Sequence, residues 1–117
     1  MAEKTVSELT ELVLKFRDER DWKQFHNPKD QALSLCLEAA ELLEIMQWRN
    51  AAELDKHLES NKQRLGEELS DVLGWVLLLA HDQQIDLASA FARKIQINCE
   101  KYPTDKAKGV ATKYTEL

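Results

Sequence analysis

Two pairs of acidic residues have a spacing that could support chemistry. One pair is Glu38 and Glu41, in Glu-Ala-Ala-Glu, and the other is Glu68 and Asp71, in Glu-Leu-Ser-Asp. On a helix that turns about 100° per residue, side chains three positions apart lie on one face, so each pair points one way. Apolar residues flank both pairs. If the pairs faced each other, four negative charges would gather, which is costly for partly buried ions unless a cation neutralises them.

The four carboxylates therefore predict a site for a divalent cation. Oxygen ligands favour Mg²⁺, Mn²⁺ or Ca²⁺ over zinc. A di-iron carboxylate bundle needs Glu-x-x-His on two helices, and none of the 3 histidines has a glutamate three positions before it. The alternative is that the pairs are ordinary solvated charges on helix surfaces. This alternative is weaker for Asp71, because an apolar run begins directly after it.

The rest of the sequence favours an all-α fold that could position these pairs. The chain has only 3 Gly and 2 Pro, and no segment alternates apolar and polar residues as a strand would. An amphipathic stripe of Leu9, Leu12, Val13 and Phe16 indicates the first helix. We expect a four-helix-bundle-like fold with one short extra helix. The expected helices cover about residues 6–22, 28–48, 51–58, 62–83 and 87–102. Their start signals are Thr5 with Glu8, Asn27 with Pro28, Asn50 with Glu53, and Asp86.

The segment after Asp71 has no polar side chain, since every residue from Val72 to Ala80 is apolar or glycine. A helix that is apolar all round is normally buried on all sides, which a four-helix monomer of this size rarely achieves. We therefore expect a homo-oligomer, either a dimer or a dimer of dimers. The last residues, 104–117, are polar, and we expect them to form a tail beyond a domain of residues 1–103.

Composition limits the class of protein. The 117 residues fit one small domain, with 44% apolar and 32% charged residues. A net charge of −5 argues against a general nucleic-acid binder, which depends on phosphate neutralisation. The apolar run is about half the length that a membrane span needs. No signal peptide is recognised at the start, and Cys36 and Cys99 are expected to be buried thiols in a reducing compartment. We expect a cytoplasmic protein that binds neither membrane nor nucleic acid.

The acidic pairs and their surroundings resemble a known family. Glu-x-x-Glu on one helix followed by Glu-x-x-Asp on the next resembles the MazG-like superfamily of all-α nucleoside triphosphate pyrophosphohydrolases. The resemblance is closest to its dCTP pyrophosphatase branch and covers about residues 6–103. It also rests on Phe-Arg-Asp-Glu-Arg-Asp-Trp-Lys-Gln-Phe-His at 16–26, Glu-Ile-Met-Gln-Trp at 44–48, Glu-Glu-Leu-Ser-Asp-Val-Leu at 67–73, Lys94, Asn98 and Lys-Tyr-Pro at 101–103.

The resemblance implies Mg²⁺-dependent hydrolysis of a (deoxy)nucleoside triphosphate, dCTP or a related or modified nucleotide, to the monophosphate and pyrophosphate. It also implies a role in nucleotide-pool cleaning. Glu38, Glu41, Glu68 and Asp71 would be the metal ligands, with Mn²⁺ as a possible substitute for Mg²⁺. Mg²⁺ would neutralise the triphosphate and position a water for attack at the α-phosphorus. Glu41, or alternatively Glu38, would accept the proton of that water.

Further residues are candidates for substrate binding. Lys94, Asn98 and Lys101 fall on one helix face and could hold the phosphates or the sugar, although the lysines could equally form a solvated stripe. Aromatic residues could stack on a pyrimidine base, and the alternative for them is core, interface or surface packing. By the resemblance, Trp22, Trp48 and Trp75 would line the base pocket, from two subunits in an oligomer. The aromatic candidates are Trp22, Phe25, His26, Trp48 and Trp75.

Two other functions stay open on the sequence alone. A pyrophosphohydrolase of the same fold could prefer another base, such as that of dUTP or a purine nucleotide. A non-catalytic helical interaction module could use the apolar run as its partner interface, although such a module has no reason to bury four carboxylates.

Overall fold

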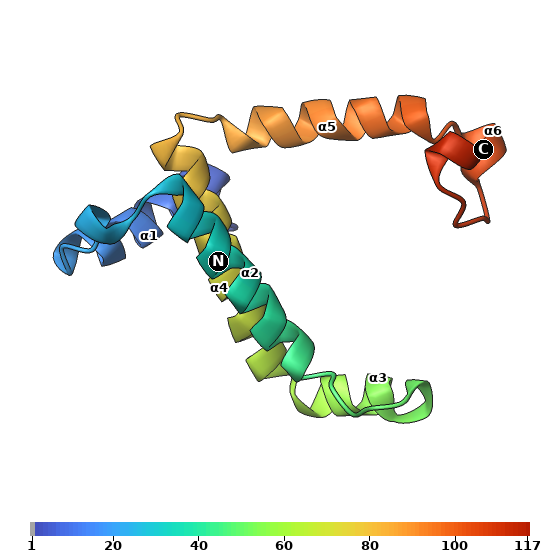
Figure 1. Cartoon of the computed structure of the whole chain (residues 1–117), viewed down its shortest axis with the longest axis horizontal. Coiled ribbons are helices and arrows are strands. Elements are labelled where there is room, and N and C mark those ends of the chain that lie inside the picture. The colour runs from blue at the N-terminus through green and yellow to red at the C-terminus, as the bar shows by residue number, and fades with distance from the viewer. Residues whose placement is uncertain (1) are drawn as a thin grey trace. The chain divides into compact units, whose positions relative to one another are not determined.

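The structure is a computed structural model that describes residues 2–117, and all regular structure in that range is helical. The all-α fold expected from the sequence is therefore confirmed. The elements are labelled in Figure 1 where there is room. They are α1 (Val6–Glu19), η1 (Lys23–Phe25), α2 (Pro28–Glu44), α3 (Ala51–Ser60), α4 (Lys62–Asp82), α5 (Leu87–Lys101), α6 (Thr104–Ala107) and η2 (Tyr114–Glu116).

The chain divides into two compact units, Met1–Gln84 and Ile85–Leu117. In the first unit α2 and α4 lie side by side along most of their length, and α1 also packs on α4 (Figure 1). The short α3 connects the far ends of α2 and α4. The few fully buried apolar residues of the described chain all belong to this unit. They are Ile45, Leu77, Leu78 and Ala80.

Side-chain caps start the helices where the sequence predicts. Thr5 and Glu8 form a reciprocal capping box at the start of α1, with bonds of 3.0 and 3.1 Å. Asn50 and Glu53 repeat this arrangement before α3. Asn27 caps α2 ahead of Pro28, and Asp86 caps α5. These caps satisfy amide groups that have no partner within the helix, so each start is fixed by local chemistry.

The first two helices end earlier than predicted. The first helix stops at Glu19 rather than near Trp22, and the second stops at Glu44 rather than near Trp48. In both cases a residue with positive φ follows, Asp21 at 53° and Trp48 at 68°. A left-handed residue cannot continue a right-handed helix, so the chain turns at these positions.

The apolar run of α4 is covered largely within the chain. Leu77, Leu78 and Ala80 are buried, because α1 and α2 both pack on α4. Leu73, in the same run, stays 42% exposed. The run by itself therefore needs less cover from a second subunit than the sequence suggests.

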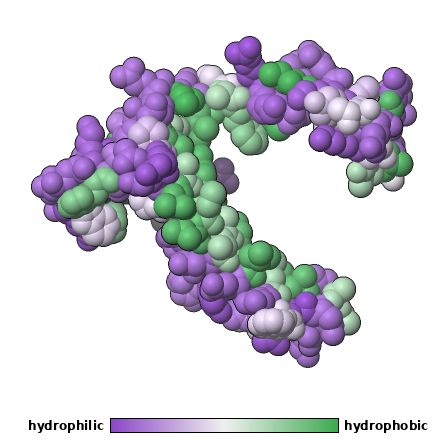
Figure 2. Space-filling view, viewed as in Figure 1, coloured by the Kyte–Doolittle hydropathy of each residue, from purple (hydrophilic) through white to green (hydrophobic). Residues whose placement is uncertain are grey.

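Much apolar surface of the α2–α4 pair is nevertheless open to solvent. Figure 2 shows apolar side chains along this pair, and we call the exposed ones among them the α2–α4 apolar face. A soluble monomer rarely leaves so many large apolar residues uncovered. The face consists of Leu33, Leu37 and Leu43 of α2 and Leu69 of α4.

The second unit consists of α5 and the residues that follow it. Residues 104–117 contain α6 and η2, so this segment has structure of its own. The rings of Tyr102 and Tyr114 pack edge to face at 5.9 Å, and the Lys101 amino group lies 4.7 Å from the centre of the Tyr114 ring. The segment expected to be a polar tail thus folds back on the end of α5.

Two further expectations concern exposure. Cys36 and Cys99 are both free thiols, but both are exposed in the single chain, so the expectation that they are buried is wrong. Cys36 lies on α2 between Leu33 and Leu37, which are exposed too. None of the helices in residues 2–117 is long and apolar enough to cross a membrane.

Candidate active site

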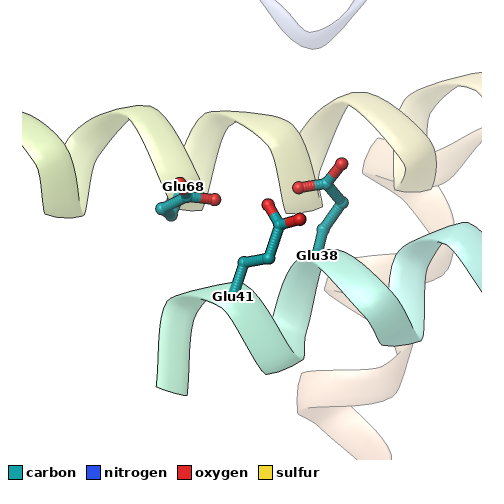
Figure 3. A group of neighbouring side chains, drawn as sticks. All are labelled: Glu38, Glu41 and Glu68. Atoms are coloured by element: carbon teal, nitrogen blue, oxygen red, sulfur yellow. The ribbon is translucent and has the colours of Figure 1, made fainter. Parts of the chain in front are cut away.

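Three carboxylates from two helices converge in the first unit. Glu38 and Glu41 come from α2 and Glu68 comes from α4, and one oxygen of each lies within 4.8 Å of the others. Figure 3 shows the three side chains in the space between the two helices. The three-residue spacing on α2 places both of its glutamates on the side that faces α4. The structure thus brings together three of the four predicted metal ligands.

The fourth predicted ligand, Asp71, lies outside this group. It is exposed and sits three positions after Glu68 on α4. Its negative charge still contributes to the raised pKa values of Glu38 and Glu68. Asp71 is therefore near the carboxylate cluster, which we define as Glu38, Glu41 and Glu68.

The electrostatics of the carboxylate cluster oppose ionisation. Burial raises the pKa of Glu38, and the nearby carboxyl groups of Glu41, Asp71 and Glu68 raise it further. Burial also raises the pKa of Glu68, as do Glu41 and Asp71, while Arg64 partly offsets these effects. Crowded carboxylates disfavour one another's charged forms, and a bound cation would reverse this preference.

Two buried oxygens of the carboxylate cluster have no hydrogen-bond partner among the described residues. They are Oε2 of Glu38 and Oε2 of Glu68. A buried carboxylate oxygen normally has a donor or a metal ion beside it. Three carboxylates from two helices fit a divalent cation that prefers oxygen ligands. The residues present therefore fit a metal site.

An apolar pocket of about 460 Å³ lies between α1 and α4, with Asp71 in its wall. This volume is in the range of small-molecule sites. Asp71 thus lines the pocket and also lies near the carboxylate cluster. We call this pocket the aromatic pocket. It is lined by Leu9, Leu12, Val13, Phe16, Arg17, Trp22, His26, Ser70, Asp71, Leu73, Gly74, Trp75, Leu77 and Leu78.

Aromatic rings form much of this wall. Phe16 and Trp22 pack edge to face with centroids 5.6 Å apart, and His26 and Trp75 do so at 5.1 Å. Gly74 faces the pocket from α4, and a Cβ built there would approach Val13 to an ordinary 3.9 Å. The structure therefore brings three of the predicted substrate residues, Trp22, His26 and Trp75, to one pocket.

Other predicted substrate residues lie elsewhere. Phe25 is 66% exposed and Trp48 is 89% exposed, and neither lines the aromatic pocket. Lys94, Asn98 and Lys101 belong to α5 in the second unit. Lys94 is exposed, and the other two are half-buried. Their roles in substrate binding remain predictions.

Sequence reasoning missed two groups of residues. The stripe of Leu9, Leu12, Val13 and Phe16 lines the aromatic pocket, and its apolar spacing could not distinguish pocket wall from core. The second group is a polar network around Arg17, which is 2% exposed and bonded to Asp82. No local pattern indicates that this arginine is buried, because its partner lies 65 positions away.

Comparisons with known proteins agree on one family. The model of the MazG-like family matches residues 33–117. The dCTP pyrophosphatase 1 of Rattus norvegicus is 40% identical over 117 residues, covering 98% of this chain and 69% of the relative. The Homo sapiens dCTP pyrophosphatase 1 is also 40% identical, with the same coverage of both chains. A crystal structure of a pyrophosphatase from Archaeoglobus fulgidus has a TM-score of 0.80 and 39% identity. It covers 88% of this chain and 96% of that one.

The chain therefore belongs to the MazG-like family, as the acidic pairs and their surroundings suggest. It is an enzyme of the nucleoside triphosphate pyrophosphohydrolase class.

Proposed function

We propose that the chain hydrolyses dCTP, or a closely related deoxynucleoside triphosphate, to the monophosphate and pyrophosphate in the presence of Mg²⁺. The observation that carries this proposal is the position of Asp71. It lines the aromatic pocket, and its charge acts on Glu38 and Glu68 of the carboxylate cluster. A base in the pocket would leave the triphosphate of the same molecule close to the acidic residues. The names of the relatives support cytosine as the base.

Glu38, Glu41, Glu68 and Asp71 would hold the metal, and their all-oxygen donor set suits Mg²⁺, with Mn²⁺ as a substitute. When bound, Mg²⁺ neutralises charge on the triphosphate and makes a coordinated water more acidic. The unpartnered oxygens of Glu38 and Glu68 support this assignment. Asp71 would complete the ligand set from its exposed position one helical turn along α4.

Glu41 is our choice for the general base, with Glu38 as the alternative. Glu41 is the exposed member of the carboxylate cluster, whereas Glu38 and Glu68 are half-buried. An exposed carboxylate can reach a water on the substrate side and hold its proton while the bond to the α-phosphorus forms.

The aromatic pocket would hold the base. Stacking of a base on an aromatic ring contributes about 1–3 kcal/mol, and Trp22 and Trp75 offer such rings. Trp48, at 89% exposure, would reach a nucleotide from another subunit of the oligomer. Lys94, Asn98 and Lys101 would contact the phosphates or the sugar.

Assembly into a homo-oligomer, a dimer or a dimer of dimers, is part of the proposal. The described residues include only four fully buried apolar side chains, while the α2–α4 apolar face is open. A second copy of the same chain would cover this face in a symmetric interface. In the cell we place this enzyme in the cytoplasm, where it would remove unwanted nucleotides from the pool.

To test this, the protein is incubated with each of the deoxynucleoside and nucleoside triphosphates and Mg²⁺, and the release of pyrophosphate is measured. We expect strongest release from dCTP and none without metal. Glu41→Gln should lower kcat by about a hundredfold or more, because it removes the base but keeps the side-chain shape. Glu59→Gln, an exposed change on α3, is the matched control. Equal release from Glu41→Gln and the control would refute the role of Glu41, and preference for another base would correct the substrate.

A further inference from the structure

A buried polar network adjoins the aromatic pocket. The guanidinium of Arg17 donates two hydrogen bonds to the Asp82 carboxylate, at 2.7 and 3.0 Å. The side-chain amide of Gln31 donates a third bond to this carboxylate, at 2.7 Å. Arg17 and Gln31 are 2% and 1% exposed. The network therefore joins α1, α2 and α4 through one shared anion.

Arg17 also faces a residue of the aromatic pocket. Its Nη1 lies 3.4 Å from Nδ1 of His26. A guanidinium has only donors, so Nδ1 can meet it only as an acceptor, and the proton of a neutral ring then belongs on Nε2. The His26 ring packs against Trp75 and lines the pocket. Among the described residues no hydrogen bond occupies Nε2, so this nitrogen is the one left for a ligand.

We propose that Arg17, Asp82 and Gln31 are positioning residues that hold His26 as a neutral ring with its proton on Nε2, so that Nε2–H donates to an acceptor atom of the bound base. The O2 carbonyl of a pyrimidine is an acceptor of this kind. The identity of the ligand rests on the proposed function, whereas the state of the ring does not.

The charges around His26 support a neutral ring. Burial lowers the pKa of His26, and the positive charge of Arg17 lowers it further, while Asp82 acts in the opposite direction. The Asp82 carboxylate is already bonded to Arg17 and Gln31, which limits its pull on the imidazole. Other charged or titratable groups near the ring are Asp71 in the aromatic pocket, and Lys23 and His81 in a second, polar pocket that His26 also lines.

Loss of Arg17 would reverse this balance. The lone Asp82 anion would favour a protonated His26, and the Nδ1 atom would lose the donor that makes it an acceptor. A cationic or mixed ring would still fill the same space, so packing alone would change little. The state of the ring can therefore be separated from the shape of the pocket.

Long-range ¹⁵N–¹H NMR spectra of the histidine rings of the full chain test whether His26 is neutral with its proton on Nε2. His57→Gln and His81→Gln variants would assign the signals. We expect His26 to be neutral at pH 7, with Nε2 protonated. In Arg17→Met its pKa should rise, and the two tautomers should mix. A wild-type ring that carries its proton on Nδ1, or that is cationic at pH 7, would overturn the proposal.

Steady-state kinetics test whether Arg17, through His26, contributes to binding of the base. Arg17→Met should raise KM for dCTP about fivefold to tenfold, the value of one hydrogen bond, with little change in kcat. The rise should shrink between pH 7.5 and pH 6, because a protonated His26 again carries a hydrogen on Nε2, whereas the neutral ring of the variant mixes its two tautomers. Arg17→Lys keeps a cationic donor and should restore part of the affinity. Lys15→Met, an exposed change on the same helix, is the control.

A second variant guards against misfolding, because Arg17→Met leaves the Asp82 anion without its partner. Arg17→Met/Asp82→Leu removes both charges, and such replacements of buried ion pairs are often tolerated. This double variant should also raise KM for dCTP, and the two neutral tautomers of His26 should mix in it. Unchanged KM in both folded variants would refute the positioning role. If the wild type hydrolyses no nucleotide, the proposed function fails while the NMR result still decides the state of His26.

Discussion

Glu38 and Glu68 are harder to ionise in the folded chain than in water, because burial and neighbouring carboxylates raise the pKa of each. For a raised pKa in the folded state, the stabilising contribution is present below the unfolded-state pKa and is lost as pH rises through the folded-state value. The metal-free chain therefore loses stability when these two groups ionise. A cation that binds the carboxylate cluster would restore it.

This leads to a prediction for Glu38→Gln. The variant should melt a few degrees above the wild type in EDTA at pH 7.5, because an amide replaces a carboxylate that burial and its neighbours disfavour. It should also lose most of the rise in melting temperature that Mg²⁺ produces in the wild type. Thermal melts with and without Mg²⁺ would measure both effects. Glu59→Gln is the control, and a lower melting temperature for Glu38→Gln in EDTA would contradict the electrostatic explanation.

Local residue patterns could predict the carboxylate cluster but not the network around Arg17. Glu38 and Glu41 on one segment, and Glu68 and Asp71 on another, show a helical spacing with apolar neighbours, and that information lies within a few positions. Arg17 follows Phe16 in an otherwise ordinary amphipathic helix. Its burial depends on an anion on α4 and an amide on α2, and this packing is not visible in either segment alone.

At the scale of elements, helix starts were predictable and two of the ends were not. Thr5, Asn27, Asn50 and Asp86 bond to amide groups within their own first turn, so the signal is local. The early ends of α1 and α2 precede residues with positive φ, including Trp48. At Trp48 the residue type gives no signal of a left-handed conformation, since tryptophan rarely adopts it, whereas Asp21 is of a type that adopts it more often.

Trp48 gives a prediction at this scale. A bulky residue with φ of 68° is strained, and 89% exposure gives it little packing to compensate. Trp48→Gly should therefore leave the melting temperature unchanged or slightly higher, because glycine adopts this φ without strain. If Trp48 stacks on the base, KM for dCTP should rise about tenfold. Thermal melts and steady-state kinetics would check both, and an unchanged KM would remove Trp48 from the substrate site.

The α1 stripe shows what an amphipathic pattern leaves open. It indicates the helix, and Leu12 and Phe16 of this stripe line the aromatic pocket while remaining 55% and 48% exposed. Apolar periodicity predicts which side of a helix avoids water, but it does not show whether protein or ligand covers that side. The pocket between α1 and α4 is visible only in the structure, because it depends on how the two helices pack.

The whole molecule has too little buried apolar surface for its size. The fully buried apolar residues number four, and 18 large apolar residues of the described chain are exposed. Domains of this length normally bury most of their apolar side chains. The sequence argument for a homo-oligomer rested on the apolar run of α4, but α1 and α2 largely cover that run within the chain. The α2–α4 apolar face provides the better reason.

Leu37→Glu tests assembly at this scale. Leu37 is 58% exposed on α2, so a glutamate fits the single chain but places a charge in the proposed interface. We expect a smaller particle in light scattering coupled to size exclusion, with helical circular dichroism retained. Lys15→Glu, outside the apolar face, should keep the wild-type mass. A wild type that already runs as a monomer would refute the proposed homo-oligomer.

The crowding of Glu38 and Glu68 also makes protons competitors of the metal. A proton and a divalent cation would bind the same carboxylate oxygens, so a cation that entered the carboxylate cluster would have to displace any proton held there. Apparent metal affinity would then decline as the pH falls. A drop in pH would thus act as a reversible inhibitor by mass action. A rise in Mg²⁺ concentration would relieve that inhibition without any allosteric site.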